Sequence, residues 1–256
     1  MAQVPAATRT LRVLRYLAAQ PEPVPLDQIA RSCGLPRSTA YHLLRAMVDE
    51  GFATHLVEEH RFGLGLAAFE VGSGYARQEP LQRIARRTLA ALTDRVGEST
   101  HLAVLHGRDV LYVVEERASG RPPLVTDVGV RLPAHLTASG RAILARLPAA
   151  QVRALYPDGS AFTDRHGIGP ATPGELRAVL RDARARGWAV EDGEVTPGLA
   201  SVAAAVLDHN AHPVAAVAVT YQDADPDRLA REVRRTADLL TRRLGGVAAD
   251  RPSTAT

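Results

Sequence analysis

The sequence predicts an α+β protein of two domains, in which a small helical domain precedes a domain built on an antiparallel sheet. Residues 1–65 contain three short helical patterns followed by a pair of short extended segments. From residue 99 onward, strand-like runs are framed by helical patterns. A chain of 256 residues is long enough for two such domains.

The composition is that of a folded soluble protein with a mild excess of positive charge. Hydrophobic residues make up 46% of the chain, and the formal net charge is +3 with an isoelectric point near 9.4. The chain contains arginine but no lysine. Arginine suits contacts with phosphate or carboxylate groups, and it also follows from a GC-rich coding genome, so both explanations stay open. Because basic and acidic residues nearly balance in residues 1–77, any nucleic-acid signal lies in local patterning rather than in bulk charge.

The single cysteine, Cys33, excludes an internal disulfide framework and any metal site built from several cysteines. It also favours a reducing compartment. The first residues, MAQVPAATRT, lack the long apolar core of a signal peptide, and no run approaches the roughly 18 to 20 apolar residues of a membrane span. We therefore expect a cytoplasmic protein without a membrane partner.

Three helical patterns open the chain. The first covers residues 8–19 and ends at PEPVP, because consecutive prolines cannot continue a helix. The second covers residues 26–33 and is followed by Gly34, which suits the left-handed position after a helix. The third begins close to Pro36. The tight CGLP turn between the second and third helices predicts a helix-turn-helix.

The third helix carries unusual residues on its outward face. Within GLPRSTAYHLLRAMVDEGF (residues 34–52), apolar residues at i, i+3, i+4 and i+7 predict the buried face: Ala40, Leu43, Leu44 and Met47. The outward residues are Arg37, Ser38, Thr39, Tyr41, His42 and Arg45. Arginines, hydroxyls, an aromatic ring and an imidazole are groups that contact phosphates and base edges in DNA. A small helical domain with no DNA role is the alternative.

A small hairpin, or wing, follows the third helix. The stretch FATHLVEEHRFGLG reads as two extended segments around a turn at Glu58, Glu59 and His60. Arg61 in the wing and Arg9 near the start of the first helix are further candidates for phosphate contacts. Ordinary solvated charge is the alternative for both.

The domain boundary lies in the segment after the wing. We assign residues 1–65 to a winged helix-turn-helix domain, 66–79 to a linker helix region and 80–247 to the second domain. Residues 64–75 read as a helix broken by glycine, and residues 80–96 as a long amphipathic helix.

The second domain combines two hairpins with several helices. Strand-like runs cover residues 99–107, 109–117, 199–208 and 213–222, and helical patterns cover residues 137–147, 173–186 and 226–244. The turns GRD and HNAH each join neighbouring strands, so we expect an antiparallel sheet. Residues 248–256, which contain RPSTAT, read as a disordered tail.

The order of these features resembles the IclR family of bacterial transcriptional regulators, and the resemblance covers nearly the whole chain. Four segments carry it: GLPRSTAYHLLRAMVDEGF, RFGLGLAAFEVGSGY, RLPAHLTASGRAILA and RARGWAVEDGEVTPGLASVAAAVLDHNAHPVAAVAV. The resemblance implies a winged helix-turn-helix, a linker helix that helps dimerisation and a GAF-like effector-binding domain. It also implies a homo-oligomer, dimer or tetramer, on a palindromic operator in double-stranded DNA, with the third helix in the major groove.

The resemblance further implies an effector-binding site in the second domain. Carried over residue by residue, this site comprises Ala138, Ser139, Glu191, Leu199, Ser201, Ala218 and Thr220. Two positions depart from the family pattern. Ser201 stands where members often have cysteine, and VAAAV lacks the proline that is common after the paired alanines. We therefore expect a pocket suited to a different ligand.

The residues themselves favour an anionic effector. Thr137 or Ser139 can cap the following helix, whose N-terminus offers free N–H groups and a positive dipole end to a small carboxylate. Capping alone is the alternative. Glu191 and Asp192 supply negative charge opposite this helix end for a hydroxyl, an amine or a bridging water, unless they are solvated loop charges. Together with the resemblance, a pocket lined by glycine and alanine beside this anion site implies a small carboxylic or aromatic acid.

No arrangement of residues in the sequence indicates an enzyme. There is no GxSxG, HExxH or GxxxxGK[ST] motif, and no GxGxxG follows a strand. Cys33 ends a helix of the DNA-binding domain, where a small apolar role fits better than catalysis. We expect no catalytic residues and no cofactor, and a GAF-like enzyme is the most distant alternative.

A metal-responsive regulator is the nearer alternative. Its donors would be His101, His106 and His135, but the first two lie on one predicted strand with a spacing that sends them to opposite faces. Ser201 in place of cysteine also removes a soft ligand. We therefore expect an organic effector and no metal.

The expected mechanism couples two sites. A small organic effector binds the second domain more tightly in one quaternary arrangement, and the linker helix passes that preference to the spacing of two recognition helices. Effector and operator then change each other's affinity reciprocally, typically by about 1–3 kcal/mol. We expect repression rather than activation.

Overall fold

The computed structural model describes residues 4–78, 80–120 and 124–247. The chain divides into two compact units, Met1–Glu79 and Pro80–Thr256, and each unit has its own hydrophobic core. Among the described residues, no helix is both long enough and apolar enough to cross a membrane.

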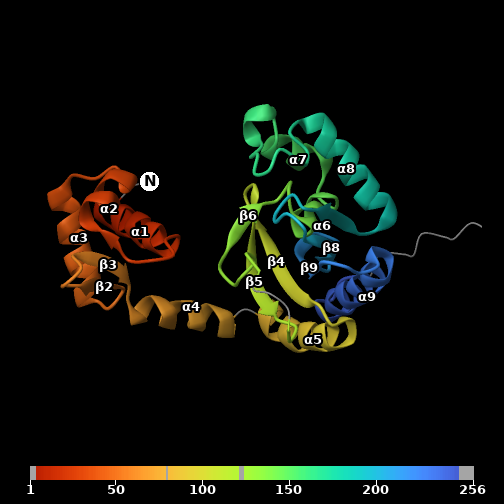
Figure 1. Ribbon diagram of the computed structural model, residues 1–256, viewed down its shortest axis with the longest axis horizontal. Coiled ribbons are helices and arrows are strands. Elements are labelled where there is room, and N and C mark those ends of the chain that lie inside the picture. The colour runs from red at the N-terminus through yellow and green to blue at the C-terminus, as the bar shows by residue number, and fades with distance from the viewer. Residues whose placement is uncertain (1–3, 79, 121–123, 248–256) are drawn as a thin grey trace, which may run out of the picture. The chain divides into compact units, whose positions relative to one another are not determined.

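Three helices open the first unit (Figure 1). They are α1 (Pro5–Ala18), α2 (Leu26–Cys33) and α3 (Arg37–Asp49), and they confirm the predicted helix-turn-helix. Helix α1 begins earlier than predicted because Pro5 fits its first turn, where the missing proline N–H costs nothing. Gly34 ends α2 with a φ of 65°, in the left-handed region that favours glycine.

Two antiparallel strands, β2 (Ala53–Leu56) and β3 (Arg61–Leu64), form the predicted wing. A third strand, β1 (Val24–Pro25), pairs with the other edge of β3. The sequence did not predict β1, because two residues that include a proline give no strand pattern.

The core of the first unit joins the three helices to the wing. Val13 of α1, Ile29 of α2, Leu44 of α3 and Phe62 of β3 are buried together. Cys33 is buried in the same cluster, in the small apolar role expected for it.

Helix α4 (Leu66–Gln78) follows the wing and is continuous over its whole length. The prediction of a helix broken by glycine was therefore wrong. Glycine inside a helix costs roughly 1 kcal/mol relative to alanine but causes no clash, so the helix continues through Gly72.

A six-stranded antiparallel sheet organises the second unit. Its strands run in the order β6 (Arg131–Pro133), β5 (Asp109–Glu116), β4 (Ser99–His106), β9 (Pro213–Tyr221), β8 (Ala200–Leu207) and β7 (Ala189–Asp192). The pairs β4–β5 and β8–β9 are the two predicted hairpins. The edge strands β6 and β7 were not predicted, because each is too short to show an alternating pattern.

Helices α5 (Pro80–Val96) and α9 (Pro226–Arg243) pack together against one face of the sheet. Val202 and Val217 from the central strands are buried beneath them. Both helices occur where the sequence predicted them, since an amphipathic pattern sustained over several turns is a strong helix signal.

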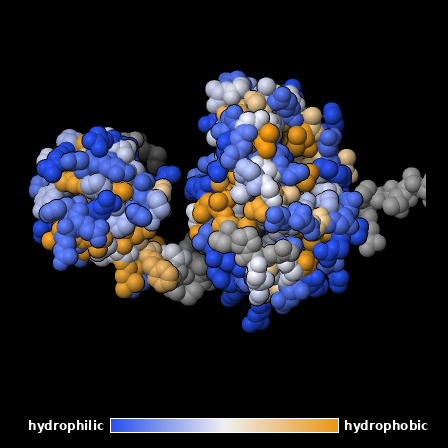
Figure 2. Space-filling model, in the orientation of Figure 1, coloured by the Kyte–Doolittle hydropathy of each residue, from blue (hydrophilic) through white to orange (hydrophobic). Residues whose placement is uncertain are grey.

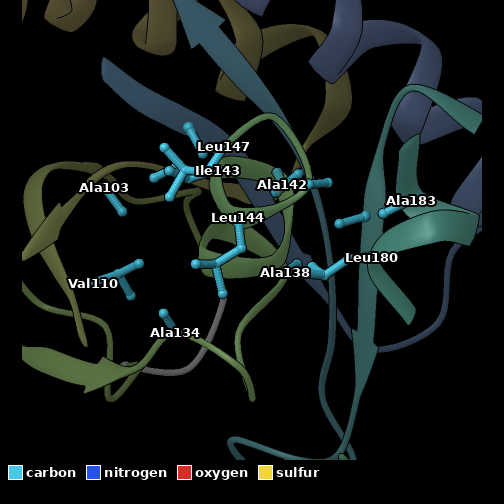
Figure 3. Packing of buried hydrophobic residues seen from close by; sticks show 14 of the residues in the cluster. Ala103, Val110, Ala134, Ala138, Ala142, Ile143, Leu144, Leu147, Leu180 and Ala183 are labelled. Carbon is cyan, nitrogen blue, oxygen red and sulfur yellow. The ribbon is translucent and has the colours of Figure 1, made fainter. Parts of the chain in front are cut away.

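The other face of the sheet is covered by α6 (Ala138–Leu144) and α8 (Pro173–Arg186), with α7 (Ala149–Leu155) beside them. Figure 3 shows this core, in which Leu144 lies between Ala103 and Val110 of the sheet and Leu180 of α8. Side chains alternate between faces along a strand, so Ala203 faces this core while Val202 faces the other.

Helix α6 is short and entirely buried. Its predicted extent reached residue 147, but it ends at Leu144, and the unpredicted α7 follows after Pro148. The predicted tail, residues 248–256, lies outside the described residues.

Candidate functional site

Helix α3 places its apolar stripe inward and its polar residues outward, as the sequence predicted. Ala40, Leu44 and Met47 are buried and Leu43 is half-buried. The outward residues that are exposed are Arg37, Ser38, Tyr41, His42 and Arg45. Thr39 differs from the rest, because it is half-buried.

Four of the outward residues line one open hollow on the surface of the first unit. Arg37, Ser38, Tyr41 and His42 border it together with Leu26 of α2, and its volume is about 430 Å³. The rings of Tyr41 and His42 meet edge to face, with centroids 5.8 Å apart. The surface therefore offers charged, hydroxyl, aromatic and imidazole groups at one place.

The arginines of this unit are held in different ways. Arg37 forms an exposed ion pair with Asp27 of α2 through its Nε atom. Arg45 and Arg9 are exposed. Arg61 is half-buried and donates from Nη1 to the carbonyl of Pro23 at 2.9 Å, so it also braces the chain between α1 and α2.

The second unit contains a cavity that brings all the predicted effector-binding residues together. Its lining includes Ala138, Ser139, Glu191, Leu199, Ser201, Ala218 and Thr220. The rest of the lining is His101, Tyr112, Leu124, Val125, Thr126, Thr137, Val195 and Thr196. We call this the effector cavity. Its lining contains no glycine among the described residues, so the expectation of a wall of glycine and alanine holds only for alanine.

The strands place three polar side chains of the effector cavity in contact with one another. Ser201 of β8 pairs with both Glu191 of β7 and Thr220 of β9 in the sheet register. The Ser201 hydroxyl donates to Glu191 Oε1 at 2.8 Å and lies 3.0 Å from Thr220 Oγ1. Ser201 therefore links the carboxyl group to the neighbouring strand.

Glu191 is a buried acid rather than a solvated loop charge. It is only 3% exposed, whereas Asp192 next to it is exposed. Burial raises the pKa of Glu191 to about 7, and the charge of Glu194 acts in the same direction, against the hydrogen bond from Ser201. The carboxyl group therefore exists in both protonation states near neutral pH.

Two buried polar atoms of other lining residues lack hydrogen-bond partners among the described residues. Ser139 Oγ and His101 Nδ1 have no hydrogen bond of good geometry within the described part of the chain. Ser139 neighbours the Tyr112 hydroxyl, whose pKa is raised by burial. His101 is held through its other nitrogen, 2.8 Å from Thr126 Oγ1. Unpaired buried polar groups are costly, so these atoms suit a ligand with polar groups of its own.

The start of α6 is positioned by tight packing and a side-chain cap. Thr137, not Ser139, caps the helix by accepting from the Gly140 N–H at 3.0 Å. A Cβ on Gly140 would lie 2.2 Å from the Ala134 carbonyl oxygen, so only glycine fits there. Ser139 is thereby left free to face the effector cavity.

Arg141 ties α6 to the edge strand that carries Glu191. It is 3% exposed, and its guanidinium donates to the carbonyls of His135 (2.8 Å) and Val190 (2.7 Å) and to Glu194 Oε1 (2.8 Å). The charge is therefore paired and its donors are used, which is the condition for burying an arginine.

The effector cavity is small, with a volume of about 20 Å³. That is room for about one water molecule. An organic acid can enter only if the walls move apart.

Sequence reasoning missed part of this cavity. Tyr112 could have been found, because it pairs with Ala103 across the β4–β5 hairpin and so shares the cavity face of the sheet. Leu124, Val125 and Thr126 come from an irregular segment, and no periodicity marks such a segment.

The structure separates the three histidines considered as metal donors. His101 borders the effector cavity, and His106 is exposed at the end of β4. His135 lies against the rings of Tyr156 and Phe162, with Nε2 3.0 Å from the Thr163 carbonyl. Within the described ranges, no three metal-binding side chains cluster.

Two family models match the chain. Residues 6–56 match the IclR helix-turn-helix domain, and residues 73–242 match the C-terminal domain of the bacterial transcriptional regulator IclR. Together the two matches cover both units.

Three known proteins illustrate the similarity. The chain is 34% identical to the glycerol operon regulatory protein of Streptomyces coelicolor, over 91% of this chain and 89% of that protein. It is 30% identical to the transcriptional repressor IclR of Escherichia coli, over 85% of this chain and 80% of that protein. A further match is the solved structure of an IclR homolog from Microbacterium hydrocarbonoxydans, complexed with 4-hydroxybenzoate. The match covers 94% of this chain and 99% of that chain, with a TM-score of 0.79. At 22% identity, it shows likeness of fold.

Proposed function

Because the chain belongs to the IclR family of bacterial transcriptional regulators, we propose that it reads an operator with the α3 face and senses a small organic acid in the effector cavity. Its relatives are regulators of transcription and not enzymes. A protein that acts on the bacterial chromosome works in the cytoplasm, which we include in the proposal.

The observation that carries operator reading is the exposed polar face of α3. Ser38, Tyr41 and His42 lie together with Arg37, and Arg45 follows one turn later. In the major groove, arginine pairs with guanine or with phosphate, and hydroxyl and imidazole groups add further contacts. Arg9 and Arg61 are proposed as phosphate contacts at the edges of this surface.

The observation that carries effector sensing is the set of unpaired buried groups in the effector cavity. Ser139 Oγ can donate to a ligand carboxylate, and Tyr112 and His101 flank it. Glu191 suits a ligand hydroxyl, and in its protonated form it can itself donate a hydrogen bond to the ligand. We propose a small carboxylic or aromatic acid held by Ala138, Ser139, Glu191, Leu199, Ser201, Ala218 and Thr220.

The small size of the effector cavity supports a coupling mechanism. Space for one water means that an organic acid stabilises a conformation with its walls farther apart. A ligand that prefers one conformation shifts the population of both, and the change in operator affinity is then typically about 1–3 kcal/mol.

We include a homo-oligomer, a dimer or a tetramer, in the proposal. Helix α4 carries large apolar side chains exposed to solvent, with Phe69 72% and Leu66 71% exposed. Figure 2 colours this stretch of the surface as hydrophobic. Apolar side chains in such a position gain by packing against a second copy. Replacing Phe69 with Glu should convert the oligomer into monomers in sedimentation experiments, and an unchanged mass would remove α4 from the interface.

We propose that the regulator represses transcription, as relatives named as repressors do. The first test is selection of bound sequences from random duplex DNA by the full-length protein at a fixed salt concentration. Enrichment of a palindrome is expected. Recovery of unrelated sequences alone, with and without a panel of organic acids, would contradict operator reading.

The effector is tested with the selected operator. Binding is measured with a panel of small carboxylic and aromatic acids, in the wild type and in Ser139→Val. One class of acid is expected to change operator affinity in the wild type and to lose this effect in the variant. Operator affinity that responds to no acid, although an acid binds, would contradict the coupling.

A further inference from the structure

The second unit contains another cavity, which shares no lining residue with the effector cavity. It lies between the end of α6, helix α8, strand β8 and helix α9, and its volume is about 330 Å³. Three arginines border it, Arg146 after α6, Arg184 on α8 and Arg234 on α9. We call it the arginine cavity.

The described lining of the arginine cavity carries an excess of positive charge. One acid, Asp238, borders the cavity and acts electrostatically on Arg146. Partial burial and the charges of Arg184 and Arg234 lower the pKa of Arg146, although arginine stays protonated in proteins. An anion bound among these like charges would be attracted by all three.

One of the three guanidinium groups is hydrogen-bonded to the backbone, and another lies against Gly187. Arg184 donates from Nε to the carbonyl of Ala145 at 2.8 Å, which leaves its Nη groups without a hydrogen bond to the described residues. Arg234 lies over Gly187, where a Cβ would stand 3.4 Å from its Cζ and Nε atoms. Gly187 has a φ of 78°, so glycine is favoured for the turn and also leaves space for the arginine. Arginines that are already positioned lose less entropy when they bind.

The shape and the remaining lining indicate the class of ligand. Guanidinium groups form paired hydrogen bonds with phosphate oxygens, and several arginines suit a doubly charged group. Ala204, Leu207 and Ala237 give the cavity an apolar part that suits a short carbon skeleton. Its volume lies at the lower end of the range for small-molecule sites. We propose that the arginine cavity binds a small phosphate ester, with the phosphate between Arg146, Arg184 and Arg234.

The experiment measures binding of ribose 5-phosphate and of inorganic phosphate to the full-length protein by calorimetry, with ribose as the uncharged control. The double variant Arg184→Gln and Arg234→Gln removes one arginine from each of two helices. The matched control, Arg177→Gln with Arg228→Gln, removes exposed arginines from the same two helices outside the cavity. We expect one phosphate ester bound per chain, at least tenfold weaker binding in the double variant and unchanged binding in the control.

A second variant covers the case in which the double variant fails to fold. Ala205→Glu keeps all three arginines and places a carboxylate at the half-buried edge of the arginine cavity. It should also weaken ester binding at least tenfold. Absence of binding to the wild type, or equal weakening in the control pair, would overturn the proposal.

Nucleic acid is the competing occupant. The test is whether a random DNA duplex displaces the ester from the wild type, and whether the double variant loses duplex binding while the control variant keeps it. If both occur, the arginine cavity binds the nucleic-acid backbone and the proposal is wrong. Operator selection and effector response do not enter this test, so its failure leaves the proposed function untouched.

Discussion

The two units of this chain place their candidate functional residues in opposite environments. In the first unit Arg37, Tyr41 and Arg45 are exposed on one helix, above a core formed by other residues. In the second unit Ser139 and Glu191 are buried in the wall of a cavity and take part in the packing of the fold. Recognition and stability are therefore separable in the first unit and joined in the second.

The largest effect on stability should come from removing the buried arginine that joins α6 to the strand carrying Glu191. Arg141→Met leaves Glu194 and two backbone carbonyls without their buried donor, which should lower the free energy of unfolding by about 3–5 kcal/mol. Urea denaturation checks this. Arg181→Met on the exposed side of α8 is the control and should stay within about 0.5 kcal/mol. Similar values for the two variants would mean that burial of Arg141 has no special cost.

A smaller effect should come from the buried acid in the effector cavity. Its folded-state pKa of about 7 exceeds the usual value of 4.5, so the folded chain retains a proton that the unfolded chain releases between these pH values. The contribution of Glu191 to stability is therefore lost as pH rises through this window. Glu191→Gln, which cannot ionise, should be more stable than the wild type by up to about 3 kcal/mol at pH 8 and equal to it at pH 4.

The measurement is urea denaturation of both proteins at pH 4, 6 and 8. Only the difference between them is compared, because other groups titrate in both. A difference that does not change with pH would show that Glu191 ionises normally in the folded chain.

Substitutions on the exposed face of α3 should weaken DNA binding and leave stability unchanged. Arg45→Ala should weaken operator binding by about 10- to 100-fold, or about 1–3 kcal/mol, without a measurable change in stability. Arg15→Ala on α1, which removes another exposed arginine, serves as the matched control in a filter-binding or anisotropy assay. Full operator affinity in Arg45→Ala would show that α3 contacts neither a base nor a phosphate at this position.

The smallest effect concerns the edge of that face. If Arg9 contacts one phosphate, Arg9→Ala should reduce the slope of log affinity against log salt by about 1, equally for all DNA sequences. Arg61→Ala should change stability as well, because Arg61 braces the Pro23 carbonyl. An unchanged slope for Arg9→Ala would assign this arginine to ordinary solvated charge.

The sequence predicted the first unit better than the second for a physical reason. The α3 stripe and the end of α2 at Gly34 depend on local periodicity and local backbone conformation, which the sequence displays directly. The effector cavity combines residues from distant strands with an irregular segment, so its predicted part came from family resemblance. Nothing local marks Glu191 as buried, because its burial depends on an edge strand too short to show a pattern.

Helix α6 has a consequence for how this sequence can evolve. Its first residues form a wall of the effector cavity, and the chain at its end carries Arg146 and the Ala145 carbonyl that holds Arg184. A substitution in this one short buried helix would alter both cavities together. Mutations that retune one ligand preference should therefore accumulate in the surrounding strands and loops, with α6 among the slowest parts of the second unit to change.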